Sequence, residues 1–167
     1  LFSAVRAGLA PIVAAIFPVP KIALLPLFII WFGIGELSKV NLILFGTLFP
    51  TIIATYGAID NVDRSLIRMG QSFNLSWYSI TKKIILPASL PAILSSMRIT
   101  AAIAIILIVA AELIAAEKGI GAYIQMAGSL FAIDRLLAGV IILSCLGLIA
   151  NWLIGFAERK LLKWRNR

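Results

Sequence analysis

The sequence predicts an all-α protein that crosses a membrane several times, a polytopic bundle of transmembrane helices in a single domain over residues 1–167. Its composition is 62% hydrophobic and 13% charged, with a mean hydropathy of +1.06, which excludes an ordinary soluble domain. Uncharged intervals long enough to span a bilayer recur, such as the twenty residues Val40–Ile59 and the twenty-two residues Leu136–Ala157. Basic residues gather in alternate intervals between them, as in membrane proteins of fixed orientation.

The first 35 residues are rich in proline. Pro11, Pro18 and Pro20 argue against one continuous helix and predict an irregular segment at the membrane surface over residues 1–21. The next fourteen residues, Ile22–Gly35, are uncharged but too short to cross unaided. They either extend backwards past Lys21 to form a span or form a re-entrant piece. A turn is expected at residues 33–36.

Two further spans are expected after Val40–Ile59. One runs from about Leu90 to Ala116 and contains Arg98 and Glu112, which a helix would separate by roughly 21 Å. These two charges either sit at opposite interfaces or line an internal aqueous path. Residues 117–121 should close this helix, and residues 122–135 should form a short connection. Leu136–Ala157 is the last span, and a basic tail follows it over residues 158–167.

The interval of residues 60–87 carries the longest charged stretch inside the apolar chain. Apolar residues at spacings of four, three and four, from Val62 to Phe73, predict one face of a helix capped by Asp60, with Asp63 three residues on. Asn74 suits the left-handed position that ends a helix, and Ser76 suits the cap of the next. We therefore expect two short amphipathic helices joined by a tight turn, with Pro87 and Pro91 marking a change of direction or a first helical turn. Such an element in a membrane protein is suited to bind a soluble partner.

The basic residues predict the orientation. If the C-terminal tail is cytoplasmic, the inside segments collect twelve basic residues and the outside segments three. The element at residues 60–87 then faces the cytoplasm. The net charge of +8 is explained by basic cytoplasmic loops that lie next to anionic lipid. Nucleic acid is therefore not an expected partner.

Few residues suit covalent chemistry. The chain has no histidine, its one cysteine is Cys145 in an apolar run, and the Gly33–Gly35 pair is not part of a phosphate-binding loop. We expect no catalytic residue, metal site or cofactor.

The element at residues 60–87 resembles the coupling loop, or Glu-Ala-Ala loop, of ABC-importer permeases. The spacing from Arg68-Met69-Gly70 through Asn74 to Ile84-Ile85-Leu86-Pro87 fits that loop, although Arg68 stands where the family has glutamate and Asn74 where it has glycine. Other stretches resemble the permeases for nitrate, sulfonate, taurine and bicarbonate, and the resemblance covers nearly the whole chain. These stretches include Pro18–Lys21, Trp31–Glu36, Leu86–Pro91 and Glu112 followed by Gly119–Gly121.

The resemblance implies the type I importer fold, with about four of its usual six spans present and one or two N-terminal spans missing. It implies a permease in the inner membrane of a prokaryote, with the C-terminus and coupling loop cytoplasmic. The expected partners are a cytoplasmic ATPase dimer, a second permease subunit as a homodimer, an extracytoplasmic substrate-binding protein and membrane lipid. The expected ATPase-coupling residues are Arg68, Met69, Gly70, Phe73, Asn74, Leu75, Ser76, Trp77, Tyr78 and Pro87.

Two other classes of function remain open. An ATP-independent channel or secondary carrier would also need several spans, but the sequence shows no matching pair of broken helices in two halves. A membrane-embedded enzyme or scaffold would need reactive groups in a span, and Glu112, Ser144 and Cys145 form no cluster. Arg98 and Glu112 are the expected residues of a translocation path; for Arg98 we also expect pairing with lipid or with the coupling helices, and for Glu112 a packing bond to a neighbouring helix.

Overall fold

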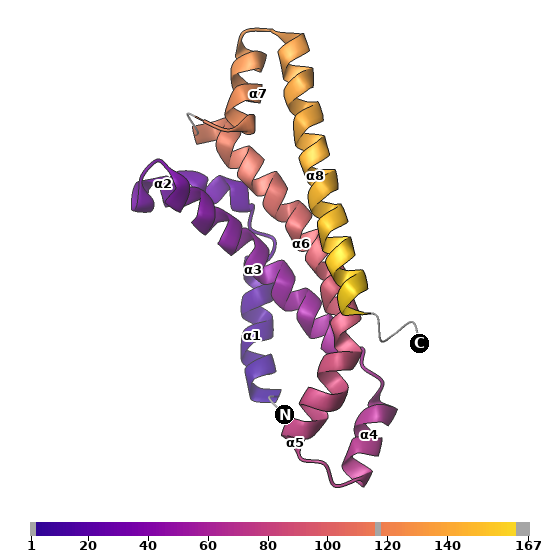
Figure 1. Ribbon diagram of the computed structural model, residues 1–167. Helices are drawn as coiled ribbons and strands as arrows, with labels where there is room; N and C mark the ends of the chain where they lie inside the picture. The colour runs from indigo at the N-terminus through magenta and orange to yellow at the C-terminus, as the bar shows by residue number, and fades with distance from the viewer. Residues whose placement is uncertain (1–2, 116–117, 163–167) are drawn as a thin grey trace.

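The computed structural model describes residues 3–115 and 118–162, and every described element is helical (Figure 1). Glu117 and the basic residues of the tail beyond Leu162 lie outside the described residues. The elements are α1 (Ser3–Ile16), the 3-10 turn η1 (Lys21–Leu24), α2 (Leu25–Phe32), α3 (Glu36–Asp60), α4 (Arg64–Ser72), α5 (Trp77–Ile80), the π-helical turn η2 (Thr81–Ile85), α6 (Leu86–Ala115), α7 (Ile120–Ser129) and α8 (Ile133–Leu161).

The N-terminal segment is more regular than its prolines predict. α1 runs for fourteen residues with Pro11 inside it, so the expectation of an irregular segment over residues 1–21 is wrong. A single proline removes one backbone hydrogen bond from a helix, and a membrane protein tolerates this because the helix satisfies the other backbone groups. The break comes only at Pro18 and Pro20, before η1.

The chain bends by 83° between Ala10–Ile16 and Lys21–Phe32, so these residues form either one broken span or a re-entrant loop. The expected turn after α2 is confirmed, because Gly33 and Gly35 have φ angles of 79° and 153°. Most other residues strongly disfavour such angles, so the two glycines permit the reversal from α2 into α3.

The core lies where α2, α3 and α6 meet. Leu25 and Phe28 of α2, Leu42 of α3 and Ala111 of α6 form one buried apolar cluster. α3 and α6 approach closely at Gly46, where an added Cβ would lie 2.2 Å from a methyl carbon of Leu107. α3 therefore packs against α6 through a small residue, as is common between helices in membranes.

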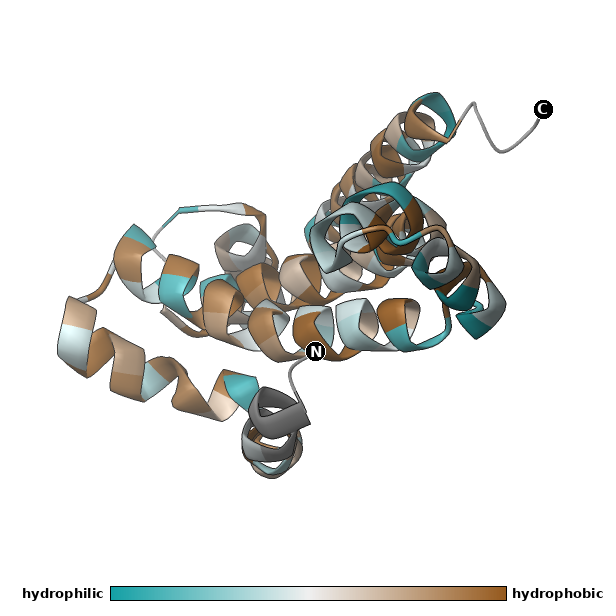
Figure 2. Ribbon diagram, turned by 90° about the horizontal axis from the view of Figure 1, so that it is seen from below, coloured by the Kyte–Doolittle hydropathy of each residue, from teal (hydrophilic) through white to brown (hydrophobic). Residues whose placement is uncertain are grey.

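Three described helices are long and apolar enough to cross a membrane, or four if the bent pair counts as a span. The three are α3, the continuous helix Trp77–Ala115 and α8, and they are largely hydrophobic along their length (Figure 2). The expected short connection over residues 122–135 is wrong in part, because α7 continues to Ser129 and α8 begins at Ile133. The chain is a multi-pass membrane protein, and it reaches the four spans that the sequence predicts only if the bent pair counts as one span.

The helices divide the molecule into two ends (Figure 1). α4 and α5 lie at one end, and the start of α1 lies at the same end. α7 and the start of α8 lie at the other end. This alternation agrees with the expected order of loops, and it does not by itself say which end faces the cytoplasm.

Candidate functional site

The first part of the candidate site is α4, which follows the end of α3 after a short turn. Asp63 is its N-cap, and the carboxylate accepts a hydrogen bond from the Ser65 backbone N–H at 2.8 Å. That backbone hydrogen bond lowers the pKa of Asp63 below its ordinary value. The expectation that Asp60 caps this helix is wrong, because Asp60 is the last residue of α3 and the aspartate three residues on is the N-cap of α4.

α4 ends in a Schellman motif centred on Asn74. The Leu75 N–H donates to the Gly70 carbonyl at 3.1 Å, and the Asn74 N–H donates to the Gln71 carbonyl at 2.9 Å. Asn74 has a φ of 54°, the left-handed conformation that its type favours over most others. Ser76 then caps α5, accepting from the Ser79 backbone N–H at 3.3 Å. The sequence prediction of a turn at residues 74–76 is confirmed.

Gly70 lets α4 fold back onto the following helix. An added Cβ at Gly70 would lie 2.7 Å from Ile84 Cδ1 and 3.3 Å from Ile80 Cγ1. Gly70 and Ile80 are both buried, whereas most of their neighbours are exposed. The packing of this element therefore depends on a small residue at position 70.

The outer surface of the element is apolar and exposed. The exposed large side chains are Leu66, Met69, Phe73, Trp77 and Tyr78. Phe73 and Tyr78 are 74% and 73% exposed, and Lys82 Nζ lies 5.8 Å from the centre of the Tyr78 ring. A cluster of exposed aromatic and apolar side chains next to basic residues is typical of a surface that a partner protein covers. We call these five residues the docking face.

The other predicted coupling residues surround the docking face. Arg68 is exposed on α4, and Leu75 is half-buried in the turn. Pro87 is half-buried at the second position of α6. The structure thus brings all ten predicted residues into one helix–turn–helix element or its junction with α6.

The second predicted short helix is not separate from the span that follows it. α5, η2 and α6 form one helix over Trp77–Ala115, 39 residues long, that continues through Pro87 and Pro91. The expectation of a change of direction there is wrong, although Pro87 does stand in the first turn of α6. The π-helical turn just before Pro87 accommodates the missing N–H, because such a turn shifts the hydrogen-bond register by one residue. A partner bound to Trp77 and Tyr78 would therefore pull directly on a transmembrane helix.

Arg98 belongs to that helix and reaches across to α8. Its Nη2 lies 2.5 Å from Glu158 Oε2, and Gly155 makes room for it, since an added Cβ there would lie 2.9 Å from Nη2. The pair is held by the attraction of opposite charges and not by an aligned hydrogen bond. Among the described residues, neither Arg98 Nε nor Glu158 Oε2 has a hydrogen-bond partner. The sequence offered lipid or the coupling helices as partners of Arg98, and the structure places it against α8 instead.

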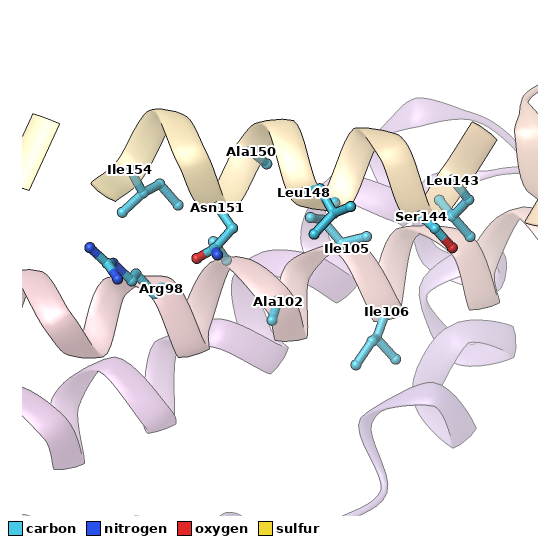
Figure 3. A pocket seen from close by; sticks show the side chains of 12 residues that line it. Arg98, Ala102, Ile105, Ile106, Leu143, Ser144, Leu148, Ala150, Asn151 and Ile154 are labelled. Atoms are coloured by element: carbon cyan, nitrogen blue, oxygen red, sulfur yellow. The ribbon is translucent and has the colours of Figure 1, made fainter. Parts of the chain in front are cut away.

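Arg98 also lines a groove of about 510 Å³ between α6 and α8 (Figure 3). Most of its walls are alanine, glycine and branched apolar residues. Asn151 of α8 extends toward α6 beside Arg98, and Ser144 lies further along. Sequence reasoning did not select Asn151, although an amide inside an apolar run was a visible signal.

Glu112 lies near the end of α6, and its side chain contacts the start of α7. Its Oε2 accepts a hydrogen bond from the Gly121 N–H at 2.8 Å, across nine residues of sequence. The carboxylate also fills the space beside Gly119, where an added Cβ would lie 2.5 Å from it. An acid at this position satisfies a free N–H and matches the positive end of the helix dipole. The packing bond to a neighbouring helix is therefore present at Glu112.

Within the described residues there is no group of three or more potential metal-ligating side chains, and Cys145 is exposed on α8. The feature that the structure does show is an exposed apolar surface joined to a long helix. The fold and this site define a class of protein: a polytopic helical membrane protein whose longest helix carries an exposed docking element at one end.

Comparison with known families identifies the class more closely. The chain belongs to the family of binding-protein-dependent transport system inner membrane components, whose sequence model matches residues 1–163. It is 40% identical to a putative aliphatic sulfonates transport permease protein of Bacillus subtilis (strain 168), over 89% of this chain and 54% of that protein.

Two further relatives have different names. The chain is 37% identical to the taurine transport system permease protein of Escherichia coli (strain K12), over 97% of this chain and 59% of that protein. It is 33% identical to the riboflavin transport system permease protein of Chloroflexus aurantiacus, over 94% of this chain and 59% of that protein. The chain thus spans between half and two thirds of the length of these curated relatives.

Proposed function

We propose that this chain is the core of a permease subunit of an ATP-driven importer in the inner membrane of a prokaryote. The subunit forms the path for a small solute and itself hydrolyses no nucleotide. The observation that carries this proposal is the docking face, of which Trp77 and Tyr78 lie on the 39-residue helix Trp77–Ala115 and the other three residues on α4 or its C-cap. A motor protein bound to Trp77 and Tyr78 can move the transmembrane helix directly, because both residues belong to that helix and no loop separates them from it. Membership of the transport-system family supports the same conclusion.

The partners follow from this role. A cytoplasmic ATPase dimer would cover the docking face of each of two permease copies, and an extracytoplasmic binding protein would deliver the solute. Basic residues support this orientation: without Lys21, which lies at the helix break, the segments assigned to the cytoplasm still hold eleven against three. The C-terminus and α4 would then both face the cytoplasm.

The solute class follows from the relatives. Two of the three relatives above are named for sulfonates or taurine, so we propose a small organic solute that carries a sulfonate or similar oxyanion group. The riboflavin relative marks the alternative. Arg98 is a candidate lining residue of the path, because it borders the groove between α6 and α8. We propose Glu112 as a cap of α7 rather than a path residue, because its carboxylate accepts the Gly121 N–H.

Uptake into proteoliposomes tests the proposal. The complete permease, its ATPase and its binding protein are reconstituted, and uptake of radiolabelled taurine and ethanesulfonate is followed with ATP, without ATP and without the binding protein. We expect uptake only when both ATP and the binding protein are present. Uptake at the same rate without ATP would identify a channel or secondary carrier and would overturn the proposal.

A further inference from the structure

Lys21 lies at a break between two helices and within the apolar layer of the molecule. The stem of its side chain packs on α3 at Gly46, where an added Cβ would lie 3.6 Å from Lys21 Cγ. Gly46 is six residues, about 9 Å along the helix, inside the uncharged interval that begins at Val40. Leu107, in the middle of the apolar run of α6, lies at the same level. Lys21 is therefore not in a surface loop, and the rule that places basic residues in cytoplasmic loops does not explain it.

The break itself creates the need for a cation. Pro20 has no N–H group, so the Ile16 carbonyl lacks the donor of a continued helix and accepts instead from the Val19 N–H at 3.1 Å. The helix also stops before the Phe17 carbonyl can accept from the backbone N–H four residues on. Lys21 Nζ supplies replacements: it donates to the Ile16 carbonyl at 3.3 Å and to the Phe17 carbonyl. The ammonium group also lies 5.2 Å from the centre of the Phe17 ring. The partial negative charge at the end of α1 thus holds the cation in place.

This arrangement leaves a positive charge without a negative partner. Lys21 forms no ion pair with any carboxylate of the described residues, whereas Arg98 and Lys39 each have one. Two of the three N–H donors of its ammonium group reach carbonyls, and one is left over. Among the residues that the structure describes, Lys21 is also the one charged side chain that lines a cavity of about 270 Å³, and the other lining residues are Val19, Pro20, Ile22, Gly46, Ile103 and Leu107. A charge at this depth is costly, and such charges commonly mark ligand or ion pathways.

We propose that Lys21 is an anion-binding residue inside the membrane, and that its free N–H receives the oxyanion group of the solute passing through the cavity. This inference rests on the proposed transport function and adds the residue that recognises the solute's acid group. A sulfonate, carboxylate or phosphate oxygen would complete the ammonium group's three hydrogen bonds and neutralise its charge. In other transporters, the carbonyls at the C-terminal ends of half-helices bind cations. Here the carbonyls at the end of α1 bind the ammonium group of Lys21 in the same way.

A lipid phosphate offers the same oxyanion chemistry. The depth of Lys21 beside Gly46 favours a solute, because lipid headgroups lie outside the uncharged interval. A direct experiment separates the two sources without requiring transport. The complete transporter is placed in nanodiscs of zwitterionic phosphatidylcholine, and its lysines are labelled by reductive methylation, with mass spectrometry reporting the rate at each position. The salt is either chloride or ethanesulfonate at equal ionic strength.

We expect Lys21 to be labelled in chloride and to be labelled severalfold more slowly in ethanesulfonate. Lys118, exposed at the other side of the core, is the control and should be labelled equally in both salts. Equal rates at Lys21 in both salts, or no labelling of Lys21 at all, would overturn the inference. A rate at Lys21 that falls when phosphatidylglycerol is added, and not with ethanesulfonate, would assign the position to lipid and would also overturn it.

Three substitutions separate binding from mere support of the helix break. Lys21→Arg keeps the charge and the donors, Lys21→Gln keeps neutral donors for the carbonyls, and Lys21→Met keeps neither. In the uptake assay we expect Lys21→Arg to retain transport and Lys21→Gln to raise the KM for ethanesulfonate by about tenfold or more, since a charged hydrogen bond is lost.

If Lys21 serves only as a cap, Lys21→Gln will transport with the wild-type KM, and the inference falls. The melting temperature of the Lys21→Met protein measures how much Lys21 stabilises the helix break. A variant that has lost transport because it is misfolded is recognised by its lowered melting temperature. Absence of ATP-driven uptake by the wild-type complex would contradict the proposed function instead, and the labelling result at Lys21 would still decide the role of this residue.

Discussion

Gly70 of α4 lies so close to Ile84, fourteen residues later in the chain, that an added Cβ would be 2.7 Å from its terminal methyl carbon. This contact fixes α4 against the start of the 39-residue helix and thereby sets the angle at which the docking face is presented. The helix–turn–helix element is therefore a packed unit with its own small core at Gly70 and Ile80.

Gly70→Val should loosen this unit. The two added methyl groups must displace Ile80 and Ile84, and overpacking of this kind costs about 1–3 kcal/mol. We expect a lower melting temperature, or a weaker ATPase interaction where α4 detaches without global unfolding. Gly57→Val in α3 is the matched control, because nothing lies within 4 Å of its added Cβ. Equal effects of the two substitutions would show that the contact with Ile84 does not matter.

Asp63 should make the start of α4 sensitive to acid. Its pKa is lowered because the folded carboxylate accepts the Ser65 N–H, so the cap contributes stability above the ordinary carboxyl pKa. That contribution is lost as the pH falls through the lowered pKa. Hydrogen exchange at the Ser65 amide should accelerate in this acidic range, beyond its intrinsic pH dependence. Asp63→Asn, which keeps a neutral acceptor, should remove that extra dependence; an unchanged pH profile in the Asn variant would contradict the assignment.

Glu112 should support α7 rather than contact the solute. Glu112→Ala leaves the Gly121 N–H without its acceptor and should cost about 1–2 kcal/mol of stability, as loss of a helix cap does. Faster hydrogen exchange at Gly121 and its neighbours would report the effect locally. Glu112→Gln retains an acceptor and should keep most of the stability and the transport rate. A stable Glu112→Gln protein that has lost uptake would place the carboxylate in the path instead.

Arg98 and Glu158 should be energetically coupled across α6 and α8. Removing either partner leaves the other charge in a partly buried site, with relative side-chain exposures of 40% and 19%, so each single substitution should destabilise the protein. In a double-mutant cycle of Arg98→Met and Glu158→Gln, we expect a coupling free energy of about 1 kcal/mol. Arg135→Met, at an exposed residue on the other half of α8, is the control. Additive effects at residues 98 and 158 would mean that the ion pair contributes nothing to packing.

Local rules of sequence predicted the parts of this fold that depend on local geometry. Asn74 at the left-handed position, Ser76 at a cap, and the glycines at residues 33 and 35 each follow from the conformations that their residue types permit. The cap of α4 was placed one helical turn too early, at Asp60 instead of Asp63, because the sequence does not show where α3 ends. Thr47 and Thr51 inside α3 donate to the carbonyls one turn back, as threonines in membrane helices commonly do. The long spans follow from uncharged length alone.

The proline rules failed where a helix absorbs a proline. Pro11 lies inside α1, and Pro87 and Pro91 lie inside the long helix, the first of these two after a π-helical turn. Rules drawn from soluble proteins treat proline as a boundary, but a lipid environment provides no water for the freed backbone groups and so favours a distorted helix over a loop.

The pairings between distant residues were also beyond the sequence. Arg98 with Glu158, and Glu112 with Gly121, join positions whose contact depends on how whole helices pack. Lys21 was read as a residue that reaches the membrane surface, because only the packing against Gly46 reveals its depth. In each case the residue type was noticeable in the sequence, and the partner was not.

The central claim is that the docking face binds the ATPase, and the affinity of the purified permease for the ATPase tests it most directly. Phe73→Ser and Tyr78→Ser remove exposed aromatic anchors from the docking face, and Phe131→Ser removes an aromatic that is 89% exposed at the opposite end of the molecule. We predict that each of the first two weakens binding by about tenfold or more, as loss of an aromatic anchor does, and that Phe131→Ser binds like wild type. Wild-type affinity in the Phe73 and Tyr78 variants, or an equal loss in the Phe131 variant, would contradict the account.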